Sequence, residues 1–121
     1  QVPIWSASQS NRAAMDEDII QANNISDSYR KIMTADFVIS LSRKMSDKQA
    51  NTARFHVIKN RFGPDGVTFP ARMNAGCGDI RIFAENSREG MGILNEMSQE
   101  ENVVKKMISN KWNAHSTEES E

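Results

Sequence analysis

The chain is poor in the residues that support extracellular or membrane-embedded folds. Cys77 is its single cysteine, so neither an internal disulfide nor a cysteine-based metal site can form. No run of about 18 apolar residues occurs, and the first residues do not form a signal-peptide pattern. We therefore expect a cytoplasmic protein with no membrane partner.

The chain also lacks the parts of a complete nucleotide-binding site. No segment fits the phosphate-binding pattern G-x-x-x-x-G-K-[ST]. No apolar strand ends in an acidic residue suited to magnesium, and no glutamate is positioned as a general base. The chain alone should therefore neither bind ATP tightly nor hydrolyse it. Because an apolar segment follows Gln1 at once, we interpret the chain as a piece of a longer protein.

Neither sign of charge is in excess overall, since 15 Lys and Arg stand against 16 Asp and Glu, but the middle of the chain is basic. Between residues 30 and 61 the only acidic residues are Asp36 and Asp47. The cations are Arg30, Lys31, Arg43, Lys44, Lys48, Arg54, Lys59 and Arg61. This pattern indicates an anionic partner such as a nucleotide or nucleic acid, although a solvated surface would give the same pattern. A length of 121 residues allows one domain with a modest core.

Short apolar segments separated by turn residues predict an α/β fold. We expect strands at 2–8, 37–42, 53–60, 67–73 and 79–83, and a short helix over 29–33 that is capped by residues 26–28. A polar loop at 11–24 holds a helical turn near 18–22, and 44–52 is a polar connection. The 37–42 strand, apolar on both faces through Ile39, is typical of a parallel or mixed sheet. The last pairings should be antiparallel, with Pro70 on an edge strand.

After Phe83 the sequence changes to a helical pattern. A capping-box pattern at 98–101 predicts a helix through Trp112. Its apolar stripe comprises Val103, Val104, Met107, Ile108 and Trp112. We expect this stripe to pack on the same or a neighbouring subunit, in preference to docking a separate protein. Residues 115–121 should form a mobile acidic tail.

The strand at 53–60 carries cations to the start of a tight turn. Residues two apart in a strand share a face, which predicts that Val57, Lys59 and Arg61 point the same way as Phe55. Asn60, on the opposite face, should brace the turn at 63–66. Two cations at a strand end suit a phosphate, and the planar fork of an arginine can bind one in a bidentate manner. The alternative is a strand that ends in solvated charges.

The order of these motifs resembles the C-terminal half of the RecA-like ATPase core of DnaB-type replicative helicases, and most resembles the phage-encoded branch. The resemblance covers about residues 2–83. It is carried by residues 8–12 after the first strand, 26–28 before the short helix, 34–36 before the next strand, and 58–61 with the turn at 63–66. It implies a partial RecA-like core with a terminal β-hairpin at 1–85, a C-terminal amphipathic helical extension at 86–114 and the disordered tail at 115–121.

The resemblance also implies a role for particular residues. Gln9 matches the γ-phosphate sensor, while Lys59 and Arg61 match the lysine and arginine finger that reach the nucleotide of a neighbouring subunit. These three residues are the implied catalytic and nucleotide-contacting set. The implied DNA contacts are Arg12, Ser28, Arg30 and Lys31. The chain departs from the family in two respects: the acids at 16–18 would repel DNA, and the family's usual glycine is not evident at Tyr29.

The implied function is the C-terminal part of an ATP-dependent replicative DNA helicase. Such a protein forms a hexameric ring and unwinds duplex DNA by translocating on single-stranded DNA, in the host cytoplasm if it is phage-encoded. A helicase loader or a primase is then the alternative partner for the apolar stripe of the C-terminal helix. ATP and Mg²⁺ would be held mainly by residues outside this chain. Two alternatives stay open: a stand-alone nucleic-acid-binding or adaptor module, and a small α/β domain whose basic middle is only solvated. We also predict that the isolated chain exposes an apolar sheet edge and is poorly stable or dependent on a partner.

Overall fold

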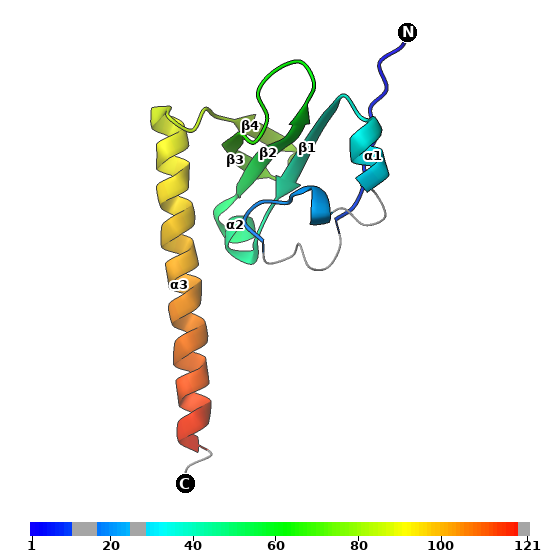
Figure 1. Cartoon of the computed structure of the whole chain (residues 1–121). Coiled ribbons are helices and arrows are strands. Elements are labelled where there is room, and N and C mark those ends of the chain that lie inside the picture. The colour runs from blue at the N-terminus through cyan, green and yellow to red at the C-terminus, as the bar shows by residue number, and fades with distance from the viewer. Residues whose placement is uncertain (11–16, 25–28, 119–121) are drawn as a thin grey trace.

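The computed structural model describes residues 1–10, 17–24 and 29–118 (Figure 1). It is a small α/β structure in which a four-stranded antiparallel sheet is followed by a long helix. The elements are η2 (Ala22–Asn24), α1 (Tyr29–Thr34), β1 (Phe37–Ser42), α2 (Met45–Ala50), β2 (Thr52–Asn60), β3 (Thr68–Asn74), β4 (Asp79–Ile82) and α3 (Arg88–Glu118). No helix among the described residues is long and apolar enough to cross a membrane.

The N-terminal segment departs from the prediction. Residues 1–9 form no strand, and Ser10 makes a single β-bridge. The helical turn expected near 18–22 lies instead at η2. The predicted caps at 26–28 lie outside the described residues, but the helix that they precede is confirmed as α1. Residues 1–9 are thus not part of the sheet, and the apolar residues among them stay exposed: Val2, Ile4 and Trp5.

The sheet has the order β1-β2-β3-β4, and every neighbouring pair is antiparallel. The predicted hairpin pairings are therefore confirmed, whereas the parallel or mixed sheet predicted for 37–42 is not seen. The reason is the length of the connection. A parallel crossover needs a dozen residues or more, while 43–51 separates β1 from β2 and includes α2.

A bulge in β2 changes which way Lys59 points. Val38 pairs with Lys59, but the next residue, Ile39, pairs with Val57, so Ile58 is an extra residue in the ladder. Residues paired across neighbouring strands share a face, and adjacent residues in a strand face opposite ways. Lys59 therefore lies on the face opposite to Val57. The predicted common face for these side chains is wrong, because strict alternation does not continue through the bulge.

Pro70 lies in an interior strand, not at an edge, since β3 is between β2 and β4 and Pro70 is buried. Its oxygen accepts a hydrogen bond of 3.0 Å from the backbone nitrogen of Phe83, and β4 already ends at Ile82. Backbone N–H and C=O groups of one strand residue point to the same side. An N–H group at this position would therefore point toward the end of β4. The proline thus removes at most one hydrogen bond, at the end of the β3–β4 ladder.

The sheet has one covered face and one open face. The covered face carries Thr52, Arg54 and Arg72, which contact α2 and α3 through Asp47 and Glu96. The open face is apolar, as the register of the three strand pairs shows, and its central members Ala53, Val57 and Ala71 are buried by their neighbours. Its other members are Ile39, Leu41, Phe55, Phe69, Met73, Ile80 and Ile82. Its outer members are about half exposed, with Ile80 at 48 % and Ile82 at 51 %. The exposed apolar surface is thus a face of the sheet that includes side chains of both edge strands, β1 and β4.

Helix α3 is longer than predicted at both ends. It begins at Arg88, and the Oγ atom of Ser87 accepts a hydrogen bond of 3.0 Å from the backbone nitrogen of Gly90, as an N-cap side chain does. The predicted cap at Ser98 is interior, where its hydroxyl donates to the oxygen of Leu94. Ile93 and Met97 are buried against the body of the protein. The helix continues to Glu118, so residues 115–118 are not the predicted tail, and 119–121 lie outside the described residues.

Candidate functional site

Lys59 binds the end of helix α1. Its Nζ atom donates to the oxygens of Ile32 at 3.0 Å and Met33 at 2.9 Å. These carbonyl groups belong to the last turn of the helix, where they have no partner within the helix and where the macrodipole is negative. The bulge makes this contact possible, because it turns Lys59 toward the face on which α1 lies. Lys59 therefore has a clear structural task in this conformation.

Arg61 lies next to the same helix end. Its Nη1 atom pairs with a carboxylate oxygen of Asp36, and its backbone nitrogen donates to the Asp36 oxygen at 2.9 Å. Both side chains are more than half exposed, at 54 % for Arg61 and 57 % for Asp36. An exposed pair of this kind contributes about 0–1 kcal/mol. The guanidinium is thus held in place weakly and stays accessible to another anion.

Asn60 braces the turn that follows β2, as predicted. Its side-chain nitrogen donates to the oxygen of Pro64 at 3.2 Å, and its side-chain oxygen accepts from the backbone nitrogen of Phe62 at 3.1 Å. Gly66 has a φ of 71°, which favours glycine, and its nitrogen donates to the oxygen of Val57 at 2.8 Å. These bonds fix the point at which the chain leaves β2, and with it the position of Arg61.

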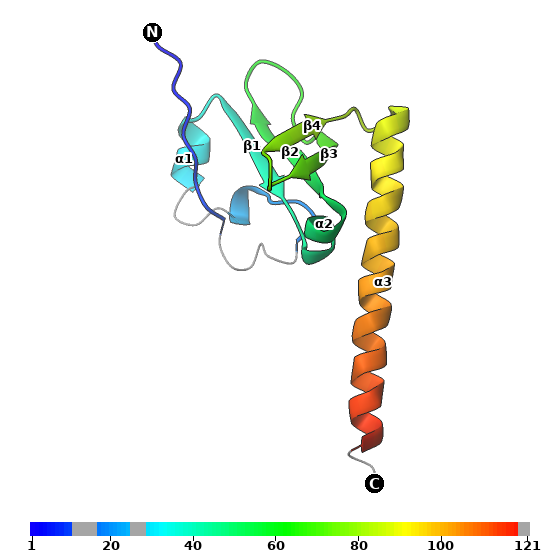
Figure 2. The ribbon, with the colours of Figure 1, turned by 180° about the vertical axis from the view of Figure 1, so that it is seen from behind.

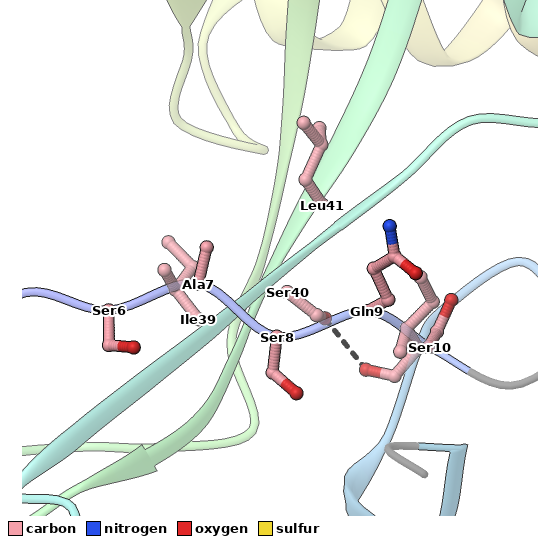
Figure 3. Close-up of a pocket in the computed structure, with 9 residues that line it drawn as sticks. Ser6, Ala7, Ser8, Gln9, Ser10, Ile39, Ser40 and Leu41 are labelled. Atoms are coloured by element: carbon pink, nitrogen blue, oxygen red, sulfur yellow. Dashed lines mark hydrogen bonds between the residues drawn. The ribbon is translucent and has the colours of Figure 1, made fainter.

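Gln9 lies beside the free edge of β1. Residues 6–10 line an open depression of about 560 Å³ together with Ile20 and residues 39–41 of β1 (Figure 3). The hydroxyl of Ser40 donates to the oxygen of Ile20 at 2.7 Å and fixes the floor of this depression. Gln9 itself is exposed, so its amide is accessible from solvent.

The structure does not bring Gln9 together with Lys59 and Arg61. Residues 1–10 run in the same direction as β1 in both ribbon views (Figures 1 and 2). Gln9 is therefore toward the Leu41 end of β1, whereas Lys59 pairs with Val38 at the beginning of that strand. The implied sensor and the implied finger lie toward opposite ends of β1.

Of the implied DNA contacts, Arg30 and Lys31 lie on α1 and are exposed. Arg12 and Ser28 lie outside the described residues. The acids that would repel DNA are only partly described: Asp16 lies outside, Glu17 is exposed, and Asp18 forms an ion pair with Lys44.

Most of the basic middle is paired within the protein. Arg43 donates to the oxygens of Thr52 and Met73, at 3.1 and 3.3 Å, and Arg54 pairs with Asp47 at 2.8 Å. Lys44 contacts Asp18 and lies 3.7 Å from Glu101. The other cations of this region are exposed on helices: Arg30, Lys31 and Lys48. The cationic surplus in the sequence thus overstates the charge that is available to a partner.

The Asp18–Lys44 pair has a defined electrostatic state. The hydrogen bond from Lys44 lowers the pKa of Asp18 below its ordinary value, and the same bond raises the pKa of Lys44. Both effects favour the charged forms. The carboxylate next to the basic region is therefore neutralised by a neighbouring lysine.

The sequence analysis assigned no contact to Asp47 or Asp36, although each pairs with an arginine. Asp47 is buried and accepts three hydrogen bonds: from the Lys44 nitrogen at 2.8 Å, from Thr52 Oγ1 at 3.0 Å and from Arg54 Nη1 at 2.8 Å. The available signal was its place as the fourth residue of the polar connection at 44–52, which leads into a strand. Asp36 could have been found by its place between α1 and β1. Within the described ranges no cluster of His, Cys, Asp or Glu could hold a metal ion.

Comparison with protein families, curated proteins and solved structures finds no match for this chain. The assignment of a function therefore depends on the motif order in the sequence and on the placement of the side chains described above.

Proposed function

We propose that this chain is the sensor and finger portion of an ATP-driven ring helicase, with the C-terminal part of a RecA-like core. In this proposal Gln9 contacts the γ-phosphate held by its own subunit, and Lys59 and Arg61 reach the nucleotide of a neighbouring subunit. Arg30 and Lys31 on α1 contact the backbone of single-stranded DNA. ATP and Mg²⁺ would be held mainly by residues outside this chain.

The placement of Arg61 is the observation that carries the proposal. Its guanidinium is more than half exposed, follows directly on the residue that braces the turn, and is paired through Nη1 with Asp36 in a weak surface contact. A phosphate offers several charged oxygens and can replace the single carboxylate oxygen of Asp36. An arginine with these properties would stabilise the charge that develops on a transferred phosphoryl group. In other systems such a finger contributes on the order of 10³ to 10⁵ in rate.

The separation of Gln9 from Arg61 supports the division of labour between subunits. A sensor acts on its own subunit's nucleotide, whereas a finger acts across a boundary, so the two are not expected at one place on the same chain. Their positions toward opposite ends of β1 fit that arrangement. An amide such as Gln9 can donate to a phosphate oxygen and accept from an attacking water without adding charge.

The open apolar face of the sheet also supports an incomplete core. Parallel α/β sheets have both faces covered by helices. Here the face with Ile39, Leu41 and Ile82 has no covering helix among the described residues. Residues 1–10 run alongside β1 in the same direction, as a further parallel strand would. Both features favour a larger assembly in which additional elements complete the sheet.

The decisive experiment replaces Arg61 in the protein that carries the complete ATPase core. Arg61→Ala should leave nucleotide binding largely intact and lower DNA-stimulated hydrolysis by about 10³ or more. Arg81→Ala is the matched control, because Arg81 is an exposed arginine on β4 that is paired with Asp79. Unchanged turnover in Arg61→Ala would remove the finger assignment.

Action across the subunit boundary needs a separate test. Arg61→Ala subunits are mixed with subunits whose own phosphate-binding lysine is replaced. If Arg61 acts in trans, mixed rings regain part of the hydrolysis that each preparation lacks. Failure to recover activity in rings shown to be mixed would assign Arg61 to its own subunit's nucleotide.

A second candidate, a nucleic-acid-binding or adaptor module without ATPase activity, is favoured by one observation. Lys59 donates two hydrogen bonds to the end of α1, and Arg30 and Lys31 stand exposed on the same short helix. Replacing both with alanine should weaken single-stranded DNA binding and flatten its salt dependence under either function. Only the helicase proposal also predicts an effect of Arg61→Ala on ATP hydrolysis.

A further inference from the structure

Strand β4 leaves one edge of the sheet open. It is the last strand in the order β1-β2-β3-β4, and no further strand pairs with it among the described residues. All four of its residues, Asp79–Ile82, are exposed. An open strand edge presents backbone donors and acceptors to which another strand can add.

The β3–β4 ladder fixes which backbone groups of β4 face outward. The nitrogen of Phe83 donates to the oxygen of Pro70 at 3.0 Å, so its N–H group points toward β3. This direction alternates along a strand, and Arg81 therefore also points its backbone groups toward β3. Ile80 and Ile82 point theirs away from the sheet. The open edge thus offers the N–H and C=O groups of these two isoleucines.

The side chains of β4 alternate between charged and apolar. Asp79 and Arg81 lie on the covered face of the sheet, while the two isoleucines lie on the open apolar face. The charged side chains are 3.3 Å apart and more than half exposed, at 51 % and 70 %. Arg72, which is opposite Arg81 on β3, is already paired with Glu96 at 2.6 Å. Asp79 and Arg81 are therefore the charges that a strand added at this edge would meet first.

These charges select one register for a second copy of β4. When Ile80 is opposite the other copy's Ile80 in the antiparallel direction, each Asp79 faces the other copy's Arg81. The outward N–H and C=O groups of the two Ile80 residues then bond to each other. Shifting the pairing by two residues places Arg81 opposite Arg81 or Asp79 opposite Asp79. Because opposite charges directly across a strand pair are favourable and like charges are not, β4 is complementary to itself in one antiparallel register.

We propose that β4 pairs antiparallel with β4 of a second copy of this chain, centred on Ile80, so that two four-stranded sheets form one continuous sheet. The contact is isologous and closes on two copies. The two open apolar faces then lie on the same side and meet at Ile80. This contact is separate from the head-to-tail contacts of a ring and rests on no part of the proposed function. ATP hydrolysis should therefore not depend on it.

Helix α3 leaves room for this partner. It contacts the covered face at β3, through the ion pair of Glu96 with Arg72. In the combined sheet the two β3 strands are three strand spacings apart, which is about 14 Å. Packed helices need about 8–10 Å between their axes. The two copies of α3 can thus lie on the same face without overlap where they contact β3.

The interface is short, so the association should be weak. A strand of four residues spans about 13 Å. Its pairing covers less area than stable protein–protein contacts do, and the dimer should form and dissociate with concentration.

Sedimentation velocity over a concentration series of the full chain tests the proposal, with wild type shifting from monomer to dimer. Ile80→Pro should weaken the dimer roughly tenfold or more, because both central N–H donors are lost. The monomer should keep its fold, since this N–H group takes no part in the β3–β4 ladder and proline is tolerated at such edge positions. Circular dichroism checks the fold. Ile80→Val, which keeps the donor, is the matched control and should dimerise almost as wild type does.

Charge reversal tests the pairing of Asp79 with Arg81. Arg81→Asp alone, or Asp79→Arg alone, should weaken the dimer roughly tenfold, because every charged pair in the contact becomes repulsive. An equal mixture of the two variants should restore it, since each pair is then opposite in charge. Lys106→Asp, the same kind of charge change at an exposed residue of α3, should have no effect.

Cross-linking gives the register independently. With Cys77 replaced by serine, chains carrying Asp79→Cys are mixed with chains carrying Arg81→Cys. The proposed register should give the mixed disulfide in preference to either self-disulfide, because residues directly opposite in a strand pair lie within disulfide reach. A monomer at every concentration, a dimer insensitive to Ile80→Pro, or preferential self-disulfides at position 79 or 81 would each overturn the proposal.

Discussion

The Nζ atom of Lys59 lies 2.9 Å from the oxygen of Met33, so a side chain of β2 holds the last turn of α1. The same ammonium also binds the oxygen of Ile32. The helix has only six residues and depends on such contacts, because helices this short are not stable alone. Lys59 therefore links the candidate phosphate-contacting turn to the helix that carries Arg30 and Lys31.

Replacing Lys59 with methionine should loosen α1 while the sheet persists. The variant keeps most of the side-chain volume but leaves two helix-end carbonyl groups without their donor, which should cost about 1–2 kcal/mol. Amide hydrogen exchange in residues 29–35 should accelerate, and Lys106→Met, an exposed lysine on α3, should leave it unchanged. Equal protection of α1 in both variants would contradict the anchoring role.

Two aspartates paired with arginines should respond very differently to truncation. Asp47 is 1 % exposed and accepts three hydrogen bonds, so Asp47→Ala leaves Arg54 without its buried partner and should destabilise the fold by about 3–5 kcal/mol. Asp36→Ala removes an exposed pair with Arg61 and should cost about 1 kcal/mol or less. Urea denaturation measures both, and similar losses would show that burial is not what distinguishes them.

Stability should decrease at acidic pH, in part through Glu96. A hydrogen bond from Arg72 lowers the pKa of Glu96 below its ordinary value of 4.5. A carboxyl group with a lowered folded-state pKa stabilises the fold above its unfolded-state pKa, and this contribution disappears as pH falls through the folded-state value. Glu96→Gln should therefore flatten the decline of unfolding free energy below about pH 4.5. Urea titrations at a series of pH values test this, and an unaltered slope would contradict it.

Two glycines near the start of α3 provide a matched pair. A Cβ atom at Gly90 would lie 2.1 Å from the oxygen of Ala84, whereas one at Gly92 would meet nothing within 4 Å. Gly90→Ala should therefore destabilise the protein by about 1–3 kcal/mol despite its better helix propensity. Gly92→Ala should stabilise it by about 0.5–1 kcal/mol. Thermal denaturation should move the two melting temperatures in opposite directions; a shift in the same direction would contradict the close approach at Gly90.

Much of the secondary structure after residue 28 could be predicted, because its signals are local. The strand at 37–42, the hairpin strands and the helix through Trp112 follow from apolar runs, turn residues and a periodic stripe. The capping-box pattern placed the start of α3 too late, at Ser98, because Gly90 and Gly92 lower helix propensity, while packing of Ile93 and the cap from Ser87 favour the earlier start. The first segment was predicted as a strand from its apolar residues, but a strand also needs a partner with a matching ladder.

For the candidate site, the sequence predicted which residues stand at the turn but not which groups they contact. Lys59, Asn60 and Arg61 were identified from their place before a glycine turn, and the bracing role of Asn60 is confirmed. Their partners could not be found, because a bulge at Ile58 and the contacts with Met33 and Asp36 join segments more than twenty residues apart. Local periodicity carries no information about such contacts.

The sequence by itself determined which segments become strands and helices and which cations stand at the end of β2, since these depend on neighbouring residues along the chain. The tertiary structure decided which way Lys59 points, which of the basic residues are already paired, and which apolar surfaces stay uncovered. These properties depend on register and on packing between distant segments. Register changes by one residue at Ile58, and that single step turns Lys59 from the open face of the sheet to the end of α1.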